Sequence, residues 1–99
     1  MDEILREKLR TRAKSKPMIR ALYIFGSRAR GDNRPDSDLD LAFDLWERSG
    51  NQLSELVSNA DAWRGELARL TGLLIEDLVL STDPEASERV LIFRREGAG

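Results

Sequence analysis

The sequence contains no cysteine and no histidine. Their absence excludes disulfides, thiolate and imidazole metal sites, and every catalytic triad that needs an imidazole base. Any chemistry must therefore rest on carboxylates, hydroxyls, arginine, lysine and the backbone. Apolar stretches approaching the roughly 18 residues of a membrane span are also absent, and the acidic start Asp2-Glu3 lacks the profile of a secretory signal. We expect a cytoplasmic protein with no membrane partner.

The length of 99 residues predicts a single domain spanning residues 1–99. The net charge is only -2, but the charges are unevenly distributed. Residues 1–35 hold ten Lys/Arg and four Asp/Glu, whereas residues 36–99 hold six and fourteen. This division fits a basic helix face packed near acidic neighbours. It also fits a fold in which one part handles phosphates and another holds cations.

Hydrophobic periodicity and punctuation by glycine and proline predict alternating helices and strands. Helices are expected over residues 2–15, 52–70 and 84–95, and strands over 21–25, 38–43 and 73–80. The third strand is apolar on both sides of an acidic pair, so we expect it at the centre of the sheet. Asp83-Pro84 resembles a capped helix start, although the RVLIFR segment alone also suits a strand. The predicted fold class is α/β (α+β) with a small sheet.

The first candidate motif, Gly26-Ser27-Arg28-Ala29-Arg30-Gly31, directly follows a predicted strand. Glycine lets a ligand approach the backbone, and the amides that come after it, with the serine hydroxyl, are suitable donors to phosphate oxygens. The two arginines add positive charge. The spacing of the glycines mimics a Walker loop, but Asp32-Asn33 replaces the required Lys-Ser/Thr, so that interpretation is rejected. Taken alone, the motif also fits a tight turn.

The second candidate motif is Ser37-Asp38-Leu39-Asp40-Leu41. In a strand, residues i and i+2 share a face about 6.6 Å apart, so both aspartates project together. Like charges on one face repel, which indicates a cation between them. Hard oxygen ligands favour Mg²⁺ or Mn²⁺, and arginine is the structural alternative. A calcium loop from Asp36 to Glu47 fits at its acidic positions but lacks the required sixth-position glycine.

Asp77 lies within the apolar run of the third predicted strand, where an acid is costly unless it is paired or coordinated. Glu76 is expected on the opposite face. If this strand lies beside the strand of Asp38, Asp77 joins Asp38 and Asp40 in a three-carboxylate metal cluster facing the Gly26-Ser27 turn. An acid paired with arginine is the alternative.

Together these residues resemble the DNA polymerase beta-like nucleotidyltransferase superfamily. The resemblance rests on Gly-Ser, Ala-Arg-Gly and Ser-Asp-x-Asp-Leu within residues 26–41, followed by the distant Asp77. More narrowly, the chain resembles the minimal nucleotidyltransferases, including the antitoxins encoded beside HEPN-domain toxins. The resemblance implies a small mixed sheet flanked by helices, two Mg²⁺ ions, and transfer of a nucleoside monophosphate from an NTP such as ATP to a hydroxyl.

The resemblance also assigns roles to individual residues. Gly26 and Ser27 would hold the triphosphate, and Arg30 would be a phosphate or structural contact. Asp38 and Asp40 would ligate both metal ions. Asp77 would complete the coordination of the metal ion near the attacking hydroxyl and would be a proton acceptor. For the antitoxin type, the implied acceptor is a tyrosine of a HEPN toxin.

Relatives of the minimal type continue past the last helix into a further short strand, and we expect this sheet to lack that strand or to obtain it from a partner. A non-catalytic module that neutralises a partner by contact is a second hypothesis. Nucleic-acid binding through the basic first helix is a third. We interpret that helix as a solvated face and do not expect a nucleic-acid partner, because the net charge of -2 gives such binding little support.

Overall fold

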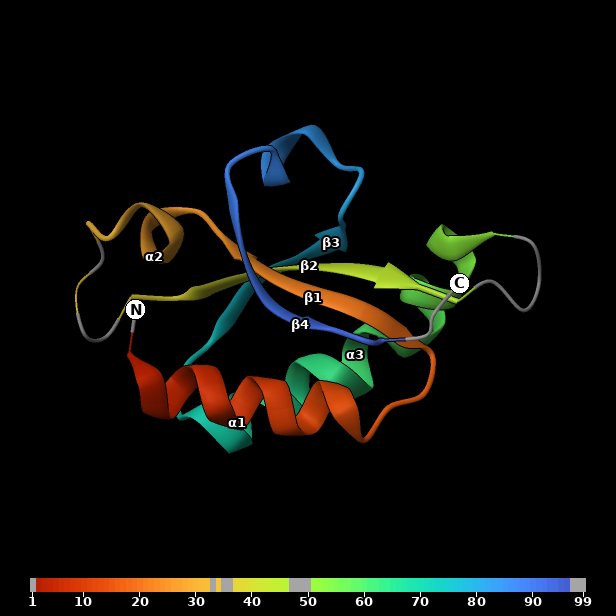
Figure 1. Ribbon diagram of the computed structural model, residues 1–99, viewed down its shortest axis with the longest axis horizontal. Helices are drawn as coiled ribbons and strands as arrows, with labels where there is room; N and C mark the ends of the chain where they lie inside the picture. Colours follow the sequence, from red (N-terminus) through yellow and green to blue (C-terminus); the bar gives the residue numbers. More distant parts are fainter. Residues whose placement is uncertain (1, 33, 35–36, 47–50, 97–99) are drawn as a thin grey trace.

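The fold is a four-stranded mixed sheet with two long helices on one face, seen here in a computed structural model (Figure 1). The structure describes residues 2–32, 34, 37–46 and 51–96. The strand order is β3-β2-β1-β4, with β2 and β3 parallel and the other pairs antiparallel. The strands are β1 (Ile19–Phe25), β2 (Leu39–Leu45), β3 (Ile75–Leu80) and β4 (Arg89–Arg94). The helical elements are α1 (Glu3–Lys14), α2 (Ser27–Arg30), α3 (Gln52–Thr71) and η1 (Pro84–Ala86).

Both long helices begin and end where the sequence supplies suitable caps. The side chain of Asp2 accepts the amide of Ile4 at the start of α1 (2.9 Å). Asn51 accepts the amides of Leu53 and Ser54 at the start of α3. The positions of α1 and α3 therefore agree with the predicted helices to within one residue at each end.

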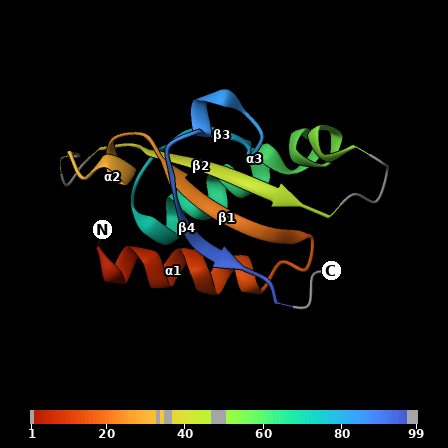
Figure 2. The same cartoon turned by 45° about the horizontal axis from the view of Figure 1, so that its top comes forward.

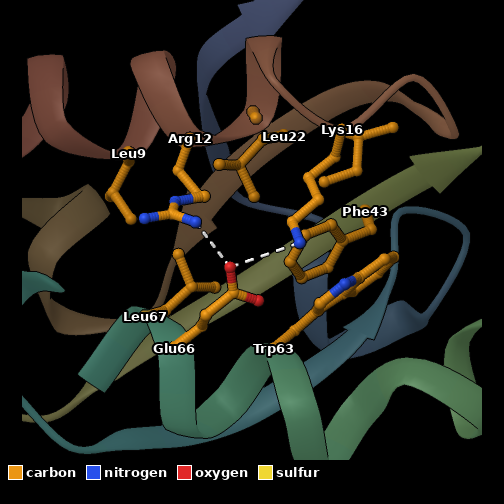
Figure 3. Close-up of a pocket in the computed structure, with 10 residues that line it drawn as sticks. Leu9, Arg12, Lys16, Leu22, Phe43, Trp63, Glu66 and Leu67 are labelled. Carbon is orange, nitrogen blue, oxygen red and sulfur yellow. Dashed lines mark hydrogen bonds and ion pairs between the residues drawn. The ribbon is translucent and has the colours of Figure 1, made fainter. Parts of the chain in front are cut away.

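The face of the sheet under α1 and α3 forms the main core, and we call it the covered face. Strand β2 alternates regularly, and Leu39, Leu41, Phe43 and Leu45 all point into this core. Phe43 packs against Trp63 of α3 with ring centroids 5.3 Å apart (Figure 3). The other face carries η1 and the chain between β3 and β4 (Figure 2), and we call it the open face. Asp40, Ala42 and Asp44 of β2 belong to this open face.

Ion pairs connect α1 and α3 at the edge of the core. Glu66 of α3 pairs with Arg12 (2.5 Å) and Lys16 (3.2 Å) from the α1 side (Figure 3). The cavity beneath this contact measures about 10 Å³, which is room for about one water molecule. The joint is therefore a packing feature rather than a ligand site.

The predicted helix over residues 84–95 is wrong. Asp83 and Pro84 do start a helical turn, but it ends at Ala86, and Arg89–Arg94 form β4 against β1. The cap is a local signal, whereas apolar RVLIFR gains more by burying Ile92 and Phe93 and by pairing with a strand far away in sequence. Strand β4 also supplies the strand that we expected to be missing or provided by a partner.

The expectation that the third strand is central is also wrong. Strand β3 lies at one end of the sheet beside β2, and its burial is correspondingly incomplete. The calcium-loop alternative depends on Asp36 and Glu47, which lie outside the described residues. No helix in the described ranges is long and apolar enough to cross a membrane.

Candidate functional site

A sharp turn at Gly26 connects β1 to the short helix α2. Gly26 has φ 75° and ψ -152°, a combination that is essentially restricted to glycine. A Cβ at this position would also overlap Oδ2 of Asp40 on the neighbouring strand. The turn therefore needs glycine for two independent reasons, its backbone conformation and the close approach of a carboxylate.

The turn presents a small set of candidate phosphate donors. The amides of Ala29 and Arg30 already donate to the carbonyl oxygen of Gly26 (3.1 and 3.2 Å). The candidate donors are thus the amides of Ser27 and Arg28 and the hydroxyl of Ser27, whose side chain is half-buried. This arrangement fits the sequence-based expectation for Gly26 and Ser27.

Asp40 is at the centre of the site. It lies on β2 opposite Phe25, the last residue of β1, and opposite Asp77 of β3. Oδ1 of Asp40 is buried and has no hydrogen-bond partner among the residues that the structure describes. A buried carboxylate oxygen without a partner is costly, so this atom calls for a cation or donor from a ligand.

A shift in strand register brings Asp77 to the same face as Asp40. Leu39 pairs with Ile75 but the next residue, Asp40, pairs with Asp77, so Glu76 is an extra residue in β3. Ile75 and Leu78 both enter the main core, although they are three positions apart. Without the extra residue, Asp77 would share the face of Ile75 and point into the apolar core.

Arg64 of α3 holds this irregular stretch of β3. Its Nη1 donates to the carbonyl oxygens of Ile75 and of Glu76, the latter at 3.0 Å. Irregular strand segments leave backbone groups without ladder partners, and this guanidinium supplies one. The role of Arg64 cannot be predicted from the sequence, because neither register shifts nor their side-chain partners have a signature in a single sequence.

Asp38 lies immediately before β2, with an exposed side chain. Arg28 holds the backbone just before Asp38, because its Nε and Nη2 donate to the carbonyl oxygen of Ser37 (3.3 and 2.7 Å). Arg30 is exposed and pairs with Asp32 at 3.4 Å. The structure thus places Arg28 as a positioning contact, while Arg30 stays at the rim of the site.

The electrostatics of Asp40 reflect this crowding of acids. Burial raises the pKa of Asp40 above its usual 3.8, and the negative charges of Asp77, Glu76 and Asp38 raise it further. A backbone hydrogen bond from Asp77 acts in the opposite direction and lowers it. Among the described residues, the charges that act on Asp40 are thus all negative.

The donor chemistry of the site fits a divalent cation such as Mg²⁺. The oxygen ligands are all carboxylates, which hard cations prefer, and Asp40 has an oxygen that needs a partner. Nevertheless, across residues 2–32, 34, 37–46 and 51–96, no three acidic side chains are gathered closely enough to hold one ion. Asp40 and Asp77 would be the principal ligands, and ligation by all three aspartates stays a prediction.

Comparisons with known proteins agree with this geometry. Residues 7–93 match the family model described as polymerase beta, nucleotidyltransferase. A crystal structure of a Sulfolobus solfataricus protein inferred to be a nucleotidyltransferase is 26% identical to this chain, with a TM-score of 0.55. The alignment covers 96% of this chain and 81% of that one. No curated protein sequence matches significantly. Since the family model spans most of the sequence, the chain belongs to the polymerase beta-like nucleotidyltransferase family.

Proposed function

We propose that this protein is a magnesium-dependent nucleotidyltransferase that transfers AMP from ATP to a hydroxyl acceptor. The single observation that carries the proposal is the setting of Asp40. Its carboxylate lies against the Gly26 turn and opposite Asp77, and its buried Oδ1 has no partner in the described part of the chain. Membership of the nucleotidyltransferase family supports the type of reaction.

Different residues of the site bind the triphosphate and the metal ions. The turn at Gly26 and Ser27 binds the triphosphate through the amides of Ser27 and Arg28 and the Ser27 hydroxyl, and Arg30 contacts it from the rim. Asp38, Asp40 and Asp77 would hold two Mg²⁺ ions, which when bound lower the pKa of an attacking hydroxyl and stabilise leaving pyrophosphate.

The transfer is an in-line displacement at the α-phosphorus. The acceptor oxygen forms a bond to that phosphorus while the bond to the bridging oxygen of pyrophosphate breaks, and Asp77 takes the acceptor proton. Such a reaction needs mainly positioning and charge neutralisation, and carboxylates supply both without histidine.

The acceptor is proposed from the resemblance to the minimal nucleotidyltransferases. On that basis, it is a tyrosine hydroxyl of a HEPN-type toxin, and the protein acts as the antitoxin in the cytoplasm. The motif residues that support the subtype lie within 26–41, together with Asp77.

The test uses purified protein, Mg²⁺, a lysate of the source cell, and ATP labelled at either the α- or the γ-phosphate. We expect label on an acceptor only from α-labelled ATP, and a loss of at least about 100-fold in Asp40→Asn. Asp44→Asn is the matched control, because Asp44 lies on the same strand and face, four residues away. Label from γ-labelled ATP, or full activity in Asp40→Asn, would contradict the proposal.

A second candidate is a contact-only module that neutralises a partner without chemistry. It is favoured by one observation, that the described acids do not gather into a three-ligand group. In that case Asp40→Asn would still neutralise the partner fully in cells, whereas a transferase would lose this effect.

A further inference from the structure

A basic groove lies between α1 and β4, at the end of the sheet away from β3. Both views show β4 running alongside α1 (Figures 1 and 2). The groove measures about 500 Å³, and its basic lining residues are Arg6, Arg10, Lys14, Arg94 and Arg95, with Glu96 the one acid. We call this surface the basic groove.

The cations of α1 form a regular row. Arg6, Arg10 and Lys14 are four residues apart and lie on one side of the helix, so they repeat about every 6 Å along its axis. Arg10 and Lys14 are exposed. In the described part of the chain, the acidic partners found in ion pairs are Glu66 and Asp32, and neither pairs with this row. The row therefore presents positive charge to solvent.

The opposite wall of the groove is an edge strand. In the described sheet, β4 is hydrogen-bonded to β1 alone. Arg6 donates to the carbonyl oxygen of Leu91 (3.0 Å), which ties α1 to this wall. Leu91 pairs with Tyr23, which is buried on the open face with Ala86 of η1, so the Leu91 side chain lies on that face and not toward α1. The groove is thus lined by cations on its α1 side.

We propose that the basic groove binds an extended acidic segment of a partner polypeptide, the protein acceptor of the proposed transfer. In an extended chain, every second side chain lies on one side, about 6.6 Å apart. Carboxylates at alternate positions therefore match the spacing of Arg6, Arg10 and Lys14.

Single-stranded nucleic acid fits this groove less well. Binding of that kind relies on exposed aromatic rings on which bases stack. The exposed large hydrophobic side chains in the described residues are all aliphatic, and Phe93 in the groove is buried with Arg95 over its ring.

The groove and the acids lie at different levels of the sheet and on different faces. Asp40 is on the open face of β2, level with Phe25 and Arg89, whereas the groove runs between α1 and residues 91–96 of the edge strand. A bound partner would therefore reach the acids by passing around the edge formed by β4. A partner held in the groove would bring a neighbouring hydroxyl near the site at high effective concentration. This link rests on the proposed function, whereas the binding itself does not.

The test measures binding of a fluorescein-labelled peptide in which glutamate alternates with threonine over about ten residues, enough to span the groove. Fluorescence anisotropy should show binding that weakens as salt rises. Arg10→Glu should weaken it by about tenfold. Lys8→Glu is the matched control, because Lys8 lies on the same helix outside the groove and the change in net charge is identical.

Several outcomes would overturn the proposal. The proposal is contradicted if the two variants weaken peptide binding equally or if the peptide does not bind. It is also contradicted if an oligouridine RNA binds more tightly than the peptide, or if the protein self-associates and Arg10→Glu abolishes this. Circular dichroism checks that both variants fold. The binding assay contains no nucleotide, so it is independent of the transfer reaction. Peptide binding without any transfer activity would contradict the proposed function but not the groove proposal. Transfer activity without groove-dependent binding would contradict the groove proposal but not the proposed function.

Discussion

The two faces of the sheet differ in role, although neighbouring residues of the same strands supply both of them. On the covered face, β2 contributes Leu39, Leu41, Phe43 and Leu45, which are at most 1% exposed. On the open face, the intervening positions include Asp40 and Asp44, and Asp40 has a buried oxygen without a partner. The covered face is buried by α1 and α3, whereas the open face combines a smaller apolar cluster under η1 with a carboxylate oxygen that has no partner among the described residues.

This difference teaches where stability and function reside in the molecule. The covered face gains free energy from burial of apolar surface. The open face carries a glycine-only turn, a register shift and crowded acids, each of which costs free energy in isolation. Substitutions of the covered core should therefore reduce stability, whereas substitutions of the open-face acids should mainly change ligand binding and chemistry.

The largest expected effect on stability is on the covered face. Phe43→Ala should lower the free energy of unfolding by about 3–5 kcal/mol, because it removes a fully buried ring and its contact with Trp63. Urea denaturation measures this loss. A cost below about 1 kcal/mol would show that the covered face is loosely packed and would weaken the contrast between the faces.

The next largest effect is expected at the junction between the faces. Gly26→Ala forces a non-glycine residue into a conformation that costs about 1–3 kcal/mol, and its Cβ overlaps Oδ2 of Asp40. Binding of ATP, measured by titration calorimetry, should be lost together with this stability. Gly31→Ala is the control, since its backbone is also left-handed but a Cβ there meets no atom within 4 Å.

A smaller effect is expected from the residue that holds β3. Arg64→Ala removes the donor to the carbonyl oxygens of Ile75 and Glu76, which should cost about 1–2 kcal/mol. We expect it to raise the Mg²⁺ concentration needed for half-maximal activity, because Asp77 is no longer held opposite Asp40. Restoration of the Mg²⁺ dependence by Arg64→Lys would indicate positioning, and an unchanged dependence in Arg64→Ala would contradict it.

The smallest effect on stability should have the opposite sign. Asp40→Asn removes a repelled carboxylate, so without divalent ions at pH 7 it should stabilise the protein. Solvent screening at this half-exposed position keeps the gain below about 1 kcal/mol, at most about 4–8 °C in Tm.

The pH dependence results from the raised pKa of Asp40. Because the folded state binds the proton more tightly, this carboxyl favours folding below the unfolded value of 3.8, and that contribution is lost as pH rises through the folded pKa. The Tm difference between Asp40→Asn and the wild type should thus vanish below about pH 3.8 and grow towards neutrality. Mg²⁺ should raise the Tm of the wild type only, and stabilisation of both proteins alike would argue against Asp40 as a ligand.

Local signals in the sequence were sufficient for much of the covered face. The long helices were predicted because their apolar spacing and end residues agree, as in α3 with Asn51 before it and Gly72 after it. The alternation around Asp40 was sufficient to place it on a strand with its apolar neighbours on the other face. The mixed sheet implied by the family resemblance is confirmed.

The remaining features depend on contacts between residues distant in sequence. Asp83-Pro84 predicts a helix because it begins a helical turn, and only pairing with β1 decides for the strand that RVLIFR also suits. The edge position of β3 is likewise a property of the whole sheet. Asp77 was predicted beside Asp40, but the extra residue Glu76 that turns it to the open face, and Arg64 that supports it, have no local signal.

Arg95 has a consequence for how the chain acquires its structure. Its guanidinium donates to the carbonyl oxygens of Ala13, Lys14 and Lys16 at the end of α1, across about eighty residues of sequence. Closing so long a loop is entropically costly, so contacts of this kind form late in folding. Once formed, they make the docking of α1 and the pairing of β4 a single cooperative event. The two walls of the basic groove should therefore exchange their amide hydrogens as one unit.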